Sequence, residues 1–418
     1  MRIRDLGYTP GTLSAGPTNS ILDVPGVAVG QVTVPTDPSS PTASSAEDEP
    51  GPIAAHKGCT IVLPRPASCI HTPCHAGTHV FNGNGELTGT NQIADWGFNN
   101  TPICFTNSLS LGTCFDAVWD HMLAHHKRMR WDALTVARNY GTPVVGETAD
   151  WAVNSELARS RLGGEDVRRA FGDCKTREEG GVVREGSFGG GAGMTCHQFA
   201  GGTGTASRLI PNGKTGVNGG EDYVLGALVQ TNYGSTIDLQ IGGVPIGKIL
   251  QKEQAVELSE ETEKERPADV HTSGTSKTDD GSILVLLITN APLAPHQLSR
   301  LARHATVGLA QVGGHGIGRT FSGDIFLALS TAEHPPEQLS EGTKMQRINP
   351  TETYKVDVVK NEAVDLFFHA ASEATEEAIL NSLVGARKGM RGIKGGYVAE
   401  GLPVERVREL LRKYMVVV

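Results

Sequence analysis

Aromatic side chains are scarce in this sequence. Phe, Trp and Tyr make up 5% of the 418 residues, whereas glycine occurs 52 times. A chain so rich in glycine is expected to make frequent turns and close backbone approaches. The apolar content of 38% and the charged content of 20% are nevertheless ordinary for a globular protein. The length permits two or three average domains, or one large layered domain.

The sequence also lacks an excess of positive charge and any long apolar run. Its net charge of -9 disfavours a nucleic-acid surface or an anchor on an anionic membrane. No run of 18 apolar residues occurs, and Met1–Asp5 is not followed by the apolar segment of a secretory signal. The 7 cysteines, scattered from Cys59 to Cys196, favour reduced thiols over a disulfide framework. We therefore expect a cytoplasmic protein without nucleic-acid or membrane partners.

Apolar runs and periodicity predict a mixture of strands and helices. Strands are expected at 59–63, 102–106, 223–230, 282–289 and 325–329, and a strand pair at 236–247 with a turn at Gly242-Gly243. Helices are expected at 113–127, 296–311, 361–383 and 403–415, the third with an acidic outer face. Residues 35–52, rich in proline and serine, are expected to form a surface loop. Because these elements show no regular βαβ rhythm, the sequence predicts a layered α+β fold.

A polar segment meets an apolar strand at Gly281–Ser282. Residues 251–281 contain nine acidic and four basic residues and almost no large apolar ones, a composition that predicts a mobile linker. Ser282 then opens the apolar run 282–289. If the backbone is cut before Ser282, this residue carries a hydroxyl and a free amine, and the amine can act as the base for the hydroxyl. The same pattern also fits an ordinary surface loop that enters a strand.

Other glycine-rich and cysteine-rich stretches have both functional and plain interpretations. The segment 82–89 could line a pocket with backbone N–H groups, with positive φ at several points, or form a tight turn. The stretches 186–194 and 201–204 lack the Gly-Lys-Ser/Thr of a phosphate loop, so close backbone packing is favoured. A third stretch supplies only fragments of the paired spacing of a zinc site, with Cys69, His71, Cys74, His75 and His79.

Polar residues near strand ends, two of them carboxylates, are a further set of candidates. Glu147 ends the apolar run 143–148, where it could pair with a substrate ammonium or simply be a solvated strand end. Ser322 and Asp324 are two residues apart, so in an extended segment they share one face. There they could hold and polarise a neighbouring amine or hydroxyl, or they could form a turn before the strand at 325–329.

Taken together, these segments occur in the order found in one known family. The motifs lie at 19–26, 82–89, 189–194 with 204–208, 230–234, 280–282, 291–298 and 322–326. In this order they resemble the DmpA-type L-aminopeptidase/D-amidase-esterase family, which includes the β-peptidyl aminopeptidases. The resemblance runs from near residue 3 to near residue 400.

The resemblance implies a fold and a maturation step. It implies a single domain over residues 1–418, built as the four-layered α-β-β-α sandwich that the family shares with ornithine acetyltransferases. It also implies a precursor that cleaves itself at Gly281–Ser282. The products would be an α chain of residues 1–281, with a mobile tail from about 251, and a β chain of residues 282–418. It asks for no cofactor and no metal, and it points to a homotetramer of αβ units.

The resemblance also implies roles for individual residues. Ser282 matches the nucleophile, Ser322 and Asp324 match the pair that orients it and its amine, and Asn232 matches the oxyanion donor. Glu147 matches the acid that receives the substrate amino group. One departure is that the family commonly places a tyrosine close after this acid, whereas Glu147 is followed by Thr-Ala-Asp-Trp at 148–151.

The function implied is that of a self-cleaving serine aminopeptidase or amidase. It would remove N-terminal residues from small peptides, amino-acid amides or esters. The alternative is an acyltransferase of the ornithine acetyltransferase type. Those enzymes expose a threonine where this chain has Ser282, so hydrolysis is favoured.

Overall fold

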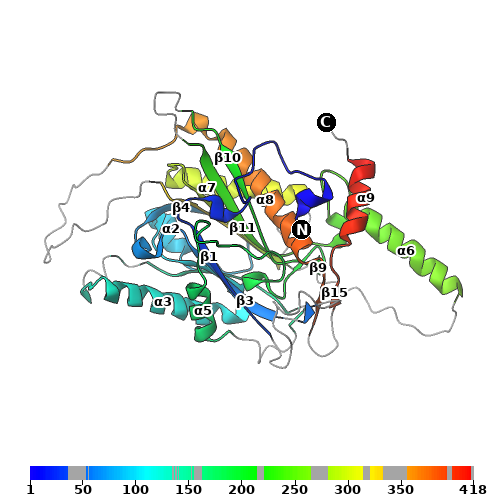
Figure 1. Ribbon diagram of the computed structural model, residues 1–418, viewed down its shortest axis with the longest axis horizontal. Coiled ribbons are helices and arrows are strands. Elements are labelled where there is room, and N and C mark those ends of the chain that lie inside the picture. The colour runs from blue at the N-terminus through cyan, green and yellow to red at the C-terminus, as the bar shows by residue number, and fades with distance from the viewer. Residues whose placement is uncertain are drawn as a thin grey trace.

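Two sheets lie face to face between two layers of helices in the computed structural model (Figure 1). The structure describes residues 1–35, 53–54, 56–133, 136, 139, 141–151, 153–154, 162–213, 221–264, 281–313, 321–332, 355–392 and 398–415. The expected four-layered α-β-β-α arrangement of an α+β fold is confirmed.

The smaller sheet has four strands in the order β1-β3-β6-β7. These are β1 (Ala28–Pro35), β3 (His56–Leu63), β6 (Ile103–Asn107) and β7 (Val144–Thr148), of which only β6 and β7 pair in parallel. Two helices, α3 (Leu111–Arg128) and α5 (Gly164–Gly172), cover its outer face. They pack there because each has an apolar stripe, which includes Val118, Met122 and Val167.

The larger sheet has six strands in the order β10-β11-β12-β13-β4-β5. They are β10 (Thr203–Ile210), β11 (Tyr223–Asn232), β12 (Ser282–Thr289), β13 (Gly323–Ser330), β4 (Cys74–Gly83) and β5 (Phe98–Asn99). Of these pairs only β12 and β13 run parallel. Helices α7 (Pro295–Gly313) and α8 (Asp365–Gly385) cover its outer face, and α2 (Thr90–Trp96) packs beside β4.

Strand β12 lies at the centre of this sandwich and is buried on both faces. Its side chains alternate, as the pleat requires. Leu284, Leu286 and Ile288 point into the core between the two sheets. Ile283, Val285 and Leu287 belong to the core beneath α7 and α8. Burial on both faces explains why the strand is an unbroken apolar run rather than an alternating one.

Shorter elements complete the described chain. Two further helices, α6 (Ile246–Lys264) and α9 (Val404–Tyr414), lie to one side of the sandwich (Figure 1). The remaining strands are β2 (Ile53–Ala54), β8 (Thr195–Cys196), β9 (Phe199–Ala200), β14 (Met390–Arg391) and β15 (Val398–Ala399). The 3-10 turns are η1 (Ile3–Leu6), η2 (Ile21–Asp23), η3 (Ala67–Cys69), η4 (Ser108–Ser110), η6 (Gly189–Gly191), η7 (Thr236–Asp238) and η9 (Asn361–Ala363). No helix among the described residues is long and apolar enough to cross a membrane.

The strands and helices predicted from apolar runs are confirmed, with one exception at 236–247. The turn at Gly242-Gly243 is present and both glycines have positive φ, of 58° and 75°. Only Ile241 and Val244 pair across it, and this bridge is isolated. The 3-10 turn η7 occupies the start of the segment and α6 begins at its end, so the expected strand pair is wrong.

The polar segment from residue 251 is more regular than expected. Helix α6 continues through it to Lys264, because Glu, Lys, Gln, Ala and Leu dominate its sequence and all are strong helix formers. An ion pair of 2.6 Å between Arg406 of α9 and Glu253 also fixes its first half. The rest of the expected tail, 265–280, lies outside the described residues. Of the loop expected at 35–52, Pro35 belongs to β1 and residues 36–52 also lie outside them.

The acidic outer face expected for the helix at 361–383 is wrong. In α8, Glu373, Glu376 and Glu377 are all buried, with exposed fractions of 9%, 3% and 0%. The N-terminal segment with η1 packs over this helix, and β10 lies beneath it. Arg208 of β10, itself 0% exposed, binds Glu373 at 2.9 Å and Glu377 at 2.8 Å. Buried acids are tolerated here because each meets a cation or a hydrogen-bond donor.

Candidate active site

Three segments that are far apart in the sequence meet at one end of the larger sheet. Ser282 is the first residue of β12. It lies opposite Asn232, the last residue of β11, and beside Gly323, the first residue of β13. The backbone N–H of Gly323 donates to Ser282 Oγ at 3.2 Å. The register of the sheet therefore places the oxyanion-donor candidate and the Ser-Gly-Asp candidate on either side of Ser282.

Ser322 and Asp324 face each other, as their spacing predicts. Ser322 Oγ donates to Asp324 Oδ1 at 2.8 Å, and both residues are almost fully buried. The carbonyl of Ser322 accepts the N–H of Asn84 at 3.1 Å, which ties this segment to the end of β4. A buried carboxylate with a hydroxyl bound to it can orient a neighbouring hydroxyl or ammonium through further hydrogen bonds.

Asn232 is held by two hydrogen bonds that define the orientation of its amide. The Oδ1 atom accepts from the backbone N–H of Thr195 at 3.1 Å, and Nδ2 donates to the carbonyl of Ala149 at 2.6 Å. An amide nitrogen carries two hydrogens, so one N–H of Asn232 remains for another acceptor. A side chain fixed in this way is suited to stabilise an oxyanion without reorganisation.

Gly281 fits a space that no other residue type would fit. A Cβ added there would lie 2.5 Å from the carbonyl oxygen of Asn232 and 2.5 Å from Tyr233 Cα. Because backbone atoms cannot yield at such distances, the residue before Ser282 has to be glycine. The Gly281–Ser282 peptide thus lies directly against the end of β11.

Glu147 lies at the end of β7, in the opposite sheet, and its carboxylate is held by two donors. The Oε1 atom accepts the backbone N–H of Glu86 at 3.0 Å, and Oε2 accepts the hydroxyl of Ser108. Gly85 lies close to this carboxylate and to the start of β13. A Cβ added to Gly85 would meet Glu147 Oε1 at 3.6 Å and Gly323 Cα at 3.2 Å. Glu147 and Gly323, the residue that pairs with Ser282, therefore both lie within 4 Å of the place that a Cβ on Gly85 would take.

The segment 82–89 contributes to this arrangement mainly through backbone N–H groups. Those of Asn84 and Glu86 bind Ser322 and Glu147, as described above. Only Gly89 in this segment has a positive φ, of 77°, so the expectation of several such positions is wrong. Gly85 serves close approach rather than an unusual backbone angle, because a Cβ there would lie 3.2 Å from Gly323 Cα.

The glycine-rich stretches at 186–194 and 201–204 pack backbone against backbone, as expected. A Cβ on Gly190 would lie 2.4 Å from the carbonyl oxygen of Phe105, and one on Gly191 would lie 2.1 Å from the amide nitrogen of Thr203. The turn η6 can therefore sit between β3 and β6 on one side and β10 on the other. This packing brings Thr195 to Asn232.

The cysteine and histidine residues at 69–79 do not gather into a ligand set. His71 Nδ1 lies 2.9 Å from His125 Nε2 of α3, and His75 and His79 lie along β4. In the part of the chain that the structure describes, one group of three close potential ligands is found, and it consists of Cys59, Cys104 and Cys114. None of these three belongs to the stretch at 69–79.

Several residues that hold the site were not identified from the sequence. Ser108, Thr195 and Ala149 each bind a predicted site residue, and two of them do so through backbone atoms. Behind Ala149, Lys57 forms a buried ion pair of 2.7 Å with Asp150. No local motif marks these residues, because their contacts arise only when β7, β8 and β11 are brought together.

Comparison with known proteins agrees with this arrangement. The model of peptidase family S58 matches residues 19–398. Beta-peptidyl aminopeptidase BapA of Sphingosinicella microcystinivorans is 35% identical over 413 residues, which cover 99% of this chain and 92% of that protein. The protein of the same name from Sphingosinicella xenopeptidilytica is 32% identical over 419 residues, with coverage of 98% and 91%.

Solved structures give the same picture. A beta-aminopeptidase from Burkholderia sp. superimposes with a TM-score of 0.75 at 36% identity, with 100% of both chains covered. The L-aminopeptidase D-Ala-esterase/amidase from Ochrobactrum anthropi superimposes with a TM-score of 0.77 at 36% identity, with 99% of this chain and 98% of that chain covered. The latter is described as a prototype for the serine aminopeptidases and as a variant of the Ntn-hydrolase fold. These similarities do not favour the acyltransferase alternative.

Proposed function

This chain belongs to peptidase family S58 and is a serine aminopeptidase, and on that premise we propose that it cleaves itself at Gly281–Ser282 and then uses Ser282 as its nucleophile. The observation that carries the proposal is the meeting of Ser282, Asn232 and the Ser322–Asp324 pair at one end of the sheet. A single domain of residues 1–418 would thus become an α chain ending at Gly281 and a β chain beginning at Ser282.

Self-cleavage follows from the chemistry of the Gly281–Ser282 peptide. Ser282 Oγ attacks the carbonyl carbon of Gly281, and the bond from this carbon to the Ser282 nitrogen breaks, which leaves an ester and a free amine. Water then hydrolyses the ester, so that Gly281 ends in a carboxylate and Ser282 regains its hydroxyl. The close fit of Gly281 against Asn232 and Tyr233 supports this step, because it restricts the peptide to one position.

Peptide hydrolysis would then use the new terminus. A free α-amino group has an ordinary pKa near 8, so it can take the proton of the Ser282 hydroxyl as the hydroxyl attacks the substrate carbonyl. The second N–H of Asn232 would bind the oxyanion, a contribution of about 3 to 4 kcal/mol in the transition state. The ammonium of Ser282 would return its proton to the leaving amine, and water would hydrolyse the acyl-enzyme. Ser322 and Asp324 would hold the amine in place.

Glu147 would select substrates that have a free amino group. Its carboxylate is already fixed by Glu86 and Ser108, so little side-chain entropy is lost when it pairs with an ammonium. Gly85 adjoins both Glu147 and Gly323, and Gly323 pairs with Ser282, so this pairing site would lie near the nucleophile. Small peptides, amino-acid amides and esters with an unblocked amino group fit such a site, and the names of the relatives support this choice.

Ala149 is one of the four residues after Glu147, the stretch in which the resemblance leads one to expect a tyrosine. Its side chain is small and has no hydroxyl, but its carbonyl accepts the Asn232 amide. Asn232 would therefore serve the oxyanion without help from a tyrosine in the stretch 148–151. We further propose that the enzyme acts in the cytoplasm as a homotetramer of αβ units, which the composition and the family resemblance support.

Intact mass measurement of the purified protein tests the self-cleavage. Wild type should give two chains, residues 1–281 and 282–418, whereas Ser282→Ala should remain one chain that does not hydrolyse aminoacyl p-nitroanilides. Ser282→Thr is the matched control, because it keeps a hydroxyl at the same position and should still cleave, though more slowly. A wild type that stays uncut and yet hydrolyses these substrates would contradict the proposed mechanism.

A further inference from the structure

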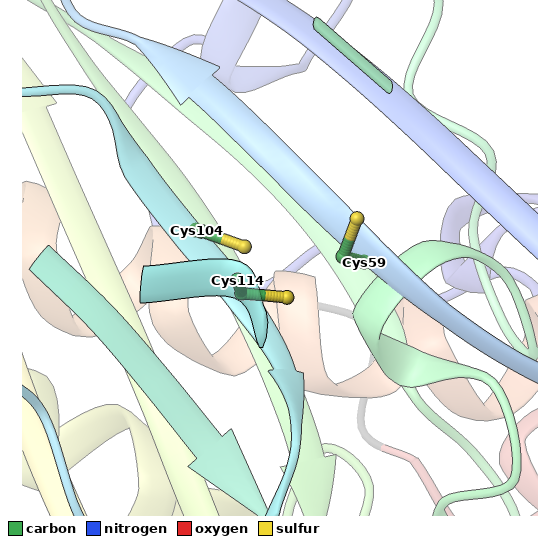
Figure 2. Close-up of side chains that lie close together, drawn as sticks. All are labelled: Cys59, Cys104 and Cys114. Atoms are coloured by element: carbon green, nitrogen blue, oxygen red, sulfur yellow. The ribbon is translucent and has the colours of Figure 1, made fainter. Parts of the chain in front are cut away.

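Three cysteine thiols from different elements meet between the smaller sheet and the helices that cover it. Cys59 lies on β3, Cys104 on the adjacent β6, and Cys114 in the first turns of α3 (Figure 2). Their sulfur atoms all lie within 4.8 Å of one another, and the three residues are 0% exposed. They belong to the core between this sheet and its covering helices, apart from the end of the larger sheet where Ser282 lies.

The spacing of these sulfurs suits a shared metal ion. A metal–sulfur bond of about 2.3 Å places the sulfurs of a three-thiolate site about 3.8 to 4.0 Å apart. The three thiols therefore need to approach by about 1 Å or less to bind one ion. A disulfide between any two of them would leave the third unused and would require a much larger approach, to about 2.05 Å.

The position of Cys114 favours negative charge at one corner of the cluster. The sulfur of Cys114 lies within 4.8 Å of the sulfurs of both Cys59 and Cys104. Cys114 also lies near the N-terminal end of α3, where free backbone N–H groups favour negative charge. Burial acts against thiolates, because an uncompensated charge has a high energy in an apolar core.

Charge decides which kind of ion fits. Three thiolates carry a charge of −3, so a monovalent ion would leave −2 in an apolar core, whereas a divalent ion leaves −1. Of these two charges, −1 costs less in the apolar core around the three fully buried cysteines. Thiolate ligands select soft or borderline ions over Mg²⁺ or Ca²⁺. We propose that Cys59, Cys104 and Cys114 form a binding site for a thiophilic divalent cation of the Zn²⁺ class.

The site would stabilise the scaffold beneath the substrate-binding carboxylate. The turn η4 joins β6 to α3, and its Ser108 donates to Glu147. An ion bound to Cys104 and Cys114 would fix the two ends of this connection. It would release up to three thiol protons and bind the folded chain only, so it should raise the apparent melting temperature. The effect on catalysis rests on the proposed role of Glu147, whereas the binding of the ion does not.

Cd²⁺ is the probe, because its thiolate complexes absorb in the ultraviolet. The folded, processed enzyme is stripped with a chelator under reducing conditions and incubated with Cd²⁺ long enough for a buried site to fill. Wild type should bind about one ion per chain, with a thiolate-to-metal absorption band and three sulfur neighbours by X-ray absorption spectroscopy. Cys59→Ala and Cys104→Ala should lose both the ion and the band. Cys74→Ala and Cys196→Ala, at buried cysteines elsewhere, are the matched controls and should keep them.

The spectroscopy on wild type keeps the test valid if a cysteine variant does not fold. Fewer than three sulfur neighbours, or an ion held equally well by the Cys59→Ala and Cys104→Ala variants, would overturn the proposal. Binding that disappears instead with Cys69→Ser or Cys174→Ser, the two partly exposed cysteines, would show adventitious surface binding and would also overturn it. Cd²⁺ content is measured independently of hydrolysis. A failure of the metal-site proposal is therefore distinguishable from a failure of the proposed active site.

Discussion

Replacement of Asn232 tests the proposed oxyanion site most directly. Its Nδ2 donates to the carbonyl of Ala149 and its Oδ1 accepts from Thr195, which leaves one N–H for the substrate oxygen. Asn232→Ala removes all three interactions. Asn232→Asp keeps an acceptor for Thr195 and nearly the same shape, but it has no N–H to donate when ionised.

Asn232→Ala should slow catalysis by more free energy than it removes from the stability of the fold. Loss of one oxyanion donor costs about 3 to 4 kcal/mol in the transition state, which is a fall in kcat of about 10² to 10³-fold. Ala149 and Thr195 are both partly exposed, so water can replace the lost partner of each. The destabilisation of the fold by Asn232→Ala is therefore expected near the lower end of the usual range, at about 1 kcal/mol per bond.

The assay measures the same site in two reactions. Hydrolysis of an aminoacyl p-nitroanilide is followed with rates normalised to the processed fraction, and the half-time of self-cleavage is followed by gel. In both variants kcat should fall with little change in KM, because the oxyanion forms only in the transition state. Self-cleavage should slow as well, since its intermediate develops the same charge. Thermal melting monitors the fold of both variants, because in Asn232→Asp an acceptor oxygen replaces the donor that faces the Ala149 carbonyl.

A normal kcat in a folded Asn232→Asp enzyme would refute the oxyanion role, because the aspartate cannot donate. A kcat that recovers fully in Asn232→Asp but not in Asn232→Ala would show that Asn232 acts only by holding Thr195. A rise in KM without a fall in kcat would assign Asn232 to ground-state binding.

Three further perturbations follow from the same structure. Glu147→Gln keeps an acceptor but removes the charge, so kcat/KM for free-amine substrates should fall about 100-fold, mainly through KM, and a rise in KM of under threefold would contradict the role. Arg208→Met leaves Glu373 buried without its cation, whereas Glu377 keeps Arg4, so denaturant unfolding should show a loss of about 3 to 5 kcal/mol, which Glu373→Gln should partly restore. Burial, with the positive charge of neighbouring histidines, lowers the pKa of His125 to about 4. The unfolded chain then binds a proton that the native chain does not, so stability is full above about pH 6.5 and is lost as the pH falls towards 4. The melting temperature should drop between pH 7 and 5, and a drop of equal size in His125→Asn would argue against this residue as the cause.

The elements of the fold were predictable wherever burial leaves a local pattern. The run at 282–289 became β12 with the same bounds, because a strand buried on both faces has to be apolar throughout. The helix at 296–311 was recognisable from the face shared by Leu298, Leu301 and Leu309, and it is α7. Prediction failed for α6, where composition suggested an irregular chain, because charged residues with high helix propensity can also form a regular helix.

The acids of α8 show why the environment of a charged residue could not be predicted. By sequence alone, Glu373, Glu376 and Glu377 read as a solvated face. They are buried because β10 brings Arg208 beneath them and the N-terminal segment covers them. Arg208 and the N-terminal segment lie more than a hundred residues away along the chain, so no local spacing could indicate that they contact these acids.

The sequence by itself determined the types of residues available for catalysis and the order in which they occur. Ser282 after a glycine, Asn232 at a strand end, and the Ser322–Asp324 spacing could all be recognised there, together with the family that they resemble. Tertiary structure alone decided which atoms meet. The sheet register puts Asn232 and Gly323 on the two sides of Ser282, and Gly85 sets the approach of Glu147. The same holds for the sulfurs of Cys59, Cys104 and Cys114. The physical reason is that propensity and periodicity act between near neighbours, whereas a site is made by long-range pairing of strands and helices.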